Sequence, residues 1–174
     1  MEKNLGKIHD LNTIRLFHKM NFPDELLPAD VLLYHGDTLF NKITDIKTGG
    51  LVDHVEVYMG HGLTVAARQE GFNYYDFNPN GLAKVRRPVA PFDLAAAETW
   101  IGPLRGLSYD DPGLFEFFNW SITNNGFICS VGAAYLLKMG GVFIFADDMD
   151  LNKISPRDFD LPRELTTIWT KQNV

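Results

Sequence analysis

The chain has 174 residues, a formal net charge of −6 at neutral pH, and a hydrophobic content of 45% with 13% aromatic residues. This length is sufficient for one domain with a sizeable core, and the hydrophobic content excludes an intrinsically disordered chain. The acidic balance, without a dense Lys/Arg cluster, argues against a nucleic-acid partner. We therefore expect a single domain over residues 1–174.

The single cysteine, Cys129, cannot form a disulfide within the chain, so nothing indicates an oxidising compartment. The N-terminal run MEKNLGKIHD has no apolar signal core. Lys138 and a glycine pair interrupt the longest apolar stretch, residues 126–146, whereas a membrane-spanning helix needs roughly 20 largely apolar residues. We expect no signal peptide and no membrane span, and a cytoplasmic or virion-associated location.

The hydrophobic pattern predicts short strands and helices, taken here in chain order. Helices are expected at residues 8–20, 39–46, 93–100 and 129–139, with Asp93 as the N-cap of the third. A buried strand is expected to follow the loop that begins at residue 26, with further strands at residues 52–59, 63–68, 72–77, 83–87 and 142–145. Ser155 and Pro156 indicate one more helical turn.

The predicted strand at residues 52–59 alternates polar and apolar side chains. His54, Glu56 and Tyr58 share one face, and the residues between them share the other. The glycine-containing turn at residues 60–62 then leads into the partner strand.

Cys129 is the candidate nucleophile. It opens the predicted helix at residues 129–139, and small residues follow it, among them Ser130 and Gly132. The unpaired amide groups at a helix start favour a thiolate, and the same amides can stabilise an oxyanion during acyl transfer. The alternative is that Cys129 is a small apolar residue of the core, which is the commoner role of a lone cysteine.

His54 is the candidate general base, because a thiol needs a base to become a nucleophile near neutral pH. The alternative is a purely structural histidine. The other histidines lie in separate predicted elements without HxxxH or HxH spacing, so we expect no metal site. The glycines match no phosphate-cradling pattern, so we expect no cofactor.

Four motifs occur in an order that is typical of one enzyme family. The first is Asp30 before a buried strand, and the second is the run from His54 to Gly60. The third is one segment that contains the pairs Tyr109-Asp110 and Cys129-Ser130, and the fourth is Pro156 with Asp158 in ISPRDF. Over residues 26–162 the chain resembles the circularly permuted NlpC-type papain-like cysteine hydrolases, including the YiiX and YebB-like proteins, and more distantly the lecithin:retinol acyltransferase group. The histidine precedes the cysteine, which favours the permuted branch. Ala29 stands where this family usually has a glycine.

The resemblance implies a papain-like α+β fold, in which a small antiparallel sheet packs against a helix that starts at the cysteine. It implies Cys129 as the nucleophile and His54 as the general base. The family usually places an orienting histidine or glutamate on the next strand, but this position falls on Ala66, which cannot accept a hydrogen bond. Glu56, where the family has glycine, or Gln69 is the candidate orienting residue. Alternatively, Glu56 is a polar residue on the wetter face of the sheet.

The implied function is a cysteine-dependent hydrolase or acyltransferase that acts on an amide or ester through a thioacyl intermediate. The expected substrate is a peptide, a peptidoglycan-type amide or a lipid ester, and the lack of a basic amphipathic helix favours the amides. The alternative is a catalytically inactive papain-like module with a binding or structural role in a larger assembly, such as a virion. Ala66 and Glu56 motivate this alternative.

Overall fold

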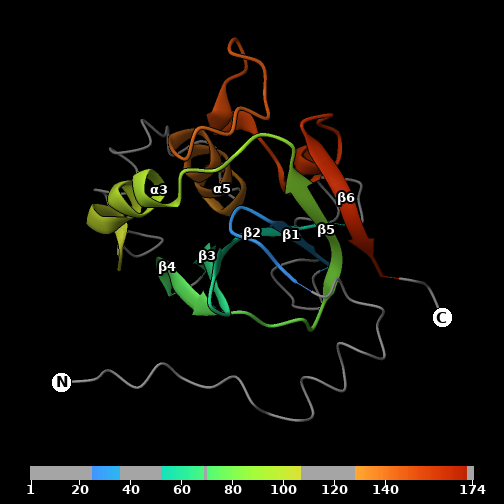
Figure 1. The fold of residues 1–174 in the computed structure, drawn as a ribbon, viewed down its shortest axis with the longest axis horizontal. Helices are drawn as coiled ribbons and strands as arrows, with labels where there is room; N and C mark the ends of the chain where they lie inside the picture. The colour runs from blue at the N-terminus through green and yellow to red at the C-terminus, as the bar shows by residue number, and fades with distance from the viewer. Residues whose placement is uncertain (1–24, 36–51, 69, 107–127, 172–174) are drawn as a thin grey trace.

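A computed structural model describes residues 25–35, 52–68, 70–106 and 128–171 of the protein. The fold is α+β: a six-stranded sheet, antiparallel in every pair, packs against two helices (Figure 1). The predicted antiparallel sheet and its packing against a helix with the cysteine at its start are therefore confirmed. The helices predicted at residues 8–20 and 39–46, and the Tyr109-Asp110 motif, lie outside the described residues.

The strands follow the order β4-β3-β2-β1-β5-β6 across the sheet. Their bounds are β1 (Val31–Tyr34), β2 (His54–Gly60), β3 (Leu63–Arg68), β4 (Gly71–Asp76), β5 (Leu82–Pro88) and β6 (Leu165–Thr170). Consecutive strands β2, β3 and β4 form a meander through short turns. The strand β1 lies in the middle of the sheet between β2 and β5, which explains why all four of its residues are buried.

Helices α3 (Leu94–Ile101) and α5 (Ile128–Met139) lie on the same side of the sheet (Figure 1). Asp93 caps α3 as predicted, because its side chain accepts a hydrogen bond of 3.0 Å from the backbone N–H of Ala96. The 3₁₀ turns are η1 (Gly102–Leu104), η2 (Leu151–Lys153) and η3 (Pro156–Asp160). The helical turn predicted at Ser155 and Pro156 is η3, and Ser155 and Asp158 form its capping box.

Each face of the sheet carries its own apolar cluster. The larger cluster joins the sheet to both helices and includes Val55 and Val57 of β2 and Val131 of α5. The smaller cluster lies on the other face and includes Leu32, Tyr34, Tyr58, Leu82, Val85 and Trp169. The alternation predicted for residues 52–59 is confirmed, because the valines and Tyr58 belong to different clusters.

Asp30 closes the turn that enters β1. Its carboxylate is fully buried and accepts a hydrogen bond from the backbone N–H of Leu27. The Nε and Nη2 atoms of Arg87 each donate to one of its two oxygens, both at 2.7 Å. Ala29, just before it, has a φ of 77°. This is the left-handed region that glycine adopts most readily, which gives a physical reason for the glycine that the resembling family prefers there.

One sequence prediction is wrong, and one strand was missed. Residues 142–145 are not a strand, because the Val142 N–H donates to the carbonyl of Leu137 at the end of α5 rather than to a neighbouring strand. The strand β6 was not predicted. A register shift opposite Val85 and Arg86 interrupts its alternation, so that Leu165 and Trp169 are buried while the threonines between them are exposed.

Candidate functional site

His54 is the first residue of β2, where it pairs with Tyr34 of β1. The rings of His54 and Tyr34 lie next to each other, with their centroids 6.0 Å apart. The imidazole keeps 25% of its side-chain surface accessible to solvent. The ring is therefore supported by the sheet and still reachable.

Cys129 lies in the first turn of α5 and is 5% exposed. Its thiol lies close enough to the His54 imidazole to affect the pKa of the ring. Burial alone would lower the pKa of His54. Interactions with Cys129, followed by those with Glu56, outweigh burial and raise the pKa of His54 to about 10. These interactions make the His54 imidazole a stronger base than a histidine in water.

Glu56 follows His54 by two residues on the same face of β2. Its side chain is 2% exposed, so it is not a charge on the wetter face of the sheet. The Oε1 atom of Glu56 lies 3.0 Å from Nε2 of His54. Burial alone would raise the pKa of Glu56, but the hydrogen bond and charge of His54, and then the charge of Arg68, lower it. The carboxyl is therefore held ionised against the imidazole.

Arg68, at the end of β3, is a member of this cluster that the sequence analysis did not identify. Its Nε and Nη2 atoms donate to Oε1 of Glu56 at 2.9 and 2.5 Å. The guanidinium carbon lies 4.2 Å from the centre of the Tyr75 ring on β4. Counting the hairpin register from the Val57–Val65 pair places Arg68 opposite His54. The same count, made on the predicted hairpin, could have identified Arg68 from the sequence.

The same count places Ala66 opposite Glu56. In the resembling family this position holds the orienting residue, whereas here it holds only the methyl group of Ala66. The carboxylate that contacts His54 comes instead from Glu56, on the opposite strand β2. Gln69, the other candidate orienting residue, lies outside the described residues.

Ser130 fixes the start of α5 from the other side. Its side chain is fully buried, and its hydroxyl donates a hydrogen bond of 2.5 Å to the carbonyl of Ile154, just before η3. The first turn of α5, which carries Cys129, is therefore held between the sheet and the segment that leads into η3.

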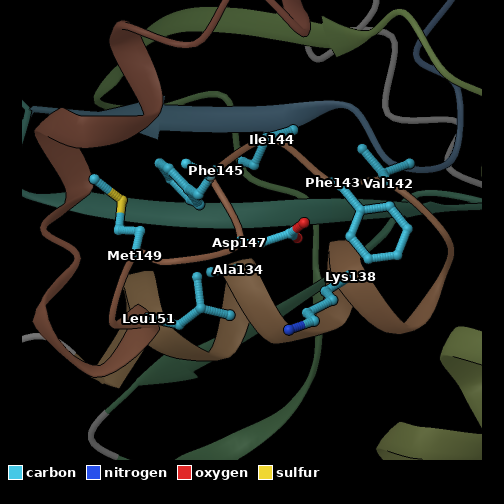
Figure 2. Close-up of a pocket in the computed structure, with 10 residues that line it drawn as sticks. Ala134, Lys138, Val142, Phe143, Ile144, Phe145, Asp147, Met149 and Leu151 are labelled. Atoms are coloured by element: carbon cyan, nitrogen blue, oxygen red, sulfur yellow. The ribbon is translucent and has the colours of Figure 1, made fainter.

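A small open pocket lies between the second half of α5 and the segment that follows it (Figure 2). Ala134 and Lys138 line it from the helix, with Phe143, Asp147 and Met149 among the residues that line it from the segment. Neither Cys129 nor His54 contributes to this pocket, so it is separate from the cluster on β2 and β3.

Among the described residues, no group of three or more His, Cys, Asp or Glu side chains could hold a metal ion. In the same part of the chain, no helix has both the length and the apolar character needed to cross a membrane. No known protein-family model matches the chain, and a comparison with curated proteins finds no match either.

Proposed function

We propose that the protein is a cysteine-dependent hydrolase or acyltransferase with a papain-like fold of the permuted NlpC type. The observation that carries this proposal is the buried His54–Glu56 pair, with Nε2 and Oε1 3.0 Å apart, close to the Cys129 thiol at the start of α5. The order of the two residues along the chain, with the histidine on a strand and the cysteine at a helix start, supports the permuted branch.

In the first step, His54 takes the proton of the Cys129 thiol. Because Nε2 of His54 is already bonded to Glu56, Nδ1 is the ring nitrogen left for the thiol. The thiolate sulfur attacks the carbonyl carbon of an amide or ester and forms a tetrahedral oxyanion. The N–H groups in the first turn of an α-helix have no acceptor within the helix, and in this mechanism those of α5 stabilise the oxyanion.

The intermediate then collapses to a thioester on Cys129. The bond from the carbonyl carbon to the leaving nitrogen or oxygen breaks, and the imidazolium of His54 donates its proton to the leaving group. A water molecule, or another acceptor, attacks the thioester while His54 removes its proton. The sulfur leaves as a thiolate and takes the proton back from His54, which restores the starting thiol and imidazole.

The favoured substrate is a peptide or peptidoglycan-type amide, with a lipid ester as the competing class. A comparison of a short peptide amide with a micellar short-chain phospholipid, each monitored for product by mass spectrometry, separates the two. Turnover of the phospholipid alone would contradict the choice of an amide.

Acylation of Cys129 by an activated ester such as p-nitrophenyl acetate tests the mechanism itself. Intact-protein mass spectrometry should detect a transient adduct of one acetyl group on the wild type, none at this position in Cys129→Ser, and slow formation in His54→Ala. An adduct that forms equally slowly in the wild type and in His54→Ala would favour the inactive papain-like module instead.

A further inference from the structure

We infer that Arg68 is a positioning residue of the proposed Cys129–His54 centre: its guanidinium, packed on the Tyr75 ring, fixes the Glu56 carboxylate in the orientation that accepts the imidazole N–H. This inference rests on the proposed function. It goes beyond a Cys–His–carboxylate set by adding an arginine that acts through the carboxylate.

Glu56 is the reason that an arginine is needed. A carboxylate that is 2% exposed is strongly disfavoured unless a charge and hydrogen bonds compensate for the lost water. The hydroxyl of Thr64 and the phenols of Tyr34 and Tyr75, which also interact with Glu56, are neutral near pH 7. Within the described part of the chain, Arg68 is the permanent cation that forms an ion pair with this carboxylate.

Arg68 is itself held on two sides. Its Nε and Nη2 atoms both donate to Oε1 of Glu56, at 2.9 and 2.5 Å, and its guanidinium stacks 4.2 Å from the centre of the Tyr75 ring. The Tyr75 hydroxyl donates a hydrogen bond of 2.7 Å to the carbonyl of Gly71, the residue that pairs with Arg68 across β3 and β4. The ring therefore cannot swing away from the guanidinium without breaking this bond.

These contacts converge on a single atom. The Oε1 atom of Glu56 accepts from both Arg68 nitrogens and also bonds Nε2 of His54, so the arginine determines where Oε1 lies relative to the imidazole. A carboxylate that loses this anchor can rotate and weaken its bond to His54. The imidazolium that forms when His54 takes the Cys129 proton then loses part of its stabilisation.

The chain contains a matched control. Arg87 pairs with the fully buried Asp30, and the side chains of Arg87 and Arg68 are both 31% exposed. Each of the substitutions Arg68→Met and Arg87→Met therefore removes an equally exposed cation from a buried carboxylate. Only Arg68→Met changes a residue that contacts the His54–Glu56 pair. Two quantities are measured in each protein: the rate of Cys129 alkylation by iodoacetamide near pH 6, and the downfield proton NMR signal of the His54 Nε2–H, assigned by its loss in His54→Ala.

In Arg68→Met we expect the alkylation rate to fall by about tenfold, the scale on which a nearby opposite charge alters an ionisation. The downfield signal should broaden or disappear. In Arg87→Met both quantities should equal those of the wild type, although thermal unfolding shifts to lower temperature. A folded Arg68→Met protein with the wild-type rate and signal would overturn the inference.

Arg68→Lys decides the question if Arg68→Met does not fold. A lysine keeps the charge but loses the fork of donors and the stacking on Tyr75, so we expect a rate about threefold below wild type, equivalent to one partly exposed cation–π contact. A wild-type rate in Arg68→Lys would overturn the inference. If the wild type itself alkylates no faster than His54→Ala, the proposed function fails, and the NMR signal alone still tests whether Arg68 positions Glu56.

Discussion

Nε2 of His54 and Oε1 of Glu56 lie 3.0 Å apart, and the two residues are separated by one residue on the same strand, β2. Side chains at this spacing point to the same face of a strand, so β2 alone supplies both members of the hydrogen bond. In the resembling family the orienting group belongs to the next strand. Here that position is Ala66, opposite Glu56, and the carboxylate reaches the imidazole from the facing position.

Glu56→Gln tests whether the charge of this carboxylate matters. The amide keeps the shape and one acceptor oxygen, but it no longer stabilises an imidazolium by charge. We expect the rate of Cys129 alkylation near neutral pH to fall by about tenfold. Glu98→Gln, which changes an exposed glutamate on α3, is the control and should react like the wild type. A wild-type rate in Glu56→Gln would remove Glu56 from the mechanism.

The stability of the protein should depend on pH through His54. Burial alone would lower the pKa of His54, but its contacts with Cys129 and Glu56 raise it to about 10 in the folded protein, above the unfolded value of about 6.5. The stabilisation is therefore fully present below about pH 6.5 and is lost as the pH rises through about 10.

Urea unfolding across this pH range checks the effect. Between the two pKa values the His54-dependent part of the unfolding free energy should fall with a slope of at most about 1.4 kcal/mol per pH unit. The difference between the wild type and His54→Gln isolates this part. An identical pH dependence in both proteins would show that the folded and unfolded imidazoles titrate alike.

Gly132 determines how closely α5 approaches the sheet. A Cβ at this position would lie 2.8 Å from Cε2 of Phe72 on β4, closer than real contacts allow. Gly132→Ala should therefore destabilise the protein by about 1–3 kcal/mol, and it should slow Cys129 alkylation because the helix that carries the thiol must shift.

A double mutant checks this explanation. Phe72→Leu removes the clashing part of the ring, so Gly132→Ala should be less harmful in that background than in the wild type. Additive losses in the double mutant would mean that the contact with Phe72 is not the reason for the glycine.

Asp30 should be structural, despite its place in the family-like motif. Asp30→Asn removes the charge that pairs with Arg87 inside the fold, and we expect a loss of about 3 kcal/mol in the free energy of unfolding. Alkylation of Cys129 in the folded variant should not change. A folded Asp30→Asn protein with an unreactive thiol would instead connect this turn to the site.

The sequence predictions succeeded where the structure depends on neighbouring residues along the chain. Alternation in residues 52–59 and the cap at Asp93 depend on neighbouring residues alone, and both are found in the structure. The run at residues 142–145 has a strand-like composition, but its first N–H is used by the end of α5. Whether a segment becomes a strand depends on a partner that composition does not specify.

The site was predictable only in part for the same reason. The residue types of His54 and Cys129 indicated their chemistry, whereas the burial of Glu56 depends on how strands β1 to β4 pack around it. Arg68 is a half-buried residue at the end of a strand, where an arginine is usually an ordinary surface charge. Only the pairing of β2 with β3, followed residue by residue, brings it to Glu56.

The rate constant for Cys129 alkylation as a function of pH, in the wild type and in His54→Ala, is the most direct measurement of the Cys129–His54 pairing. The account predicts that the wild-type thiol reacts well below the free-thiol pKa of about 8.5 and that His54→Ala loses this advantage. Equally slow rates in the two proteins, rising only with the ionisation of an ordinary thiol, would contradict it.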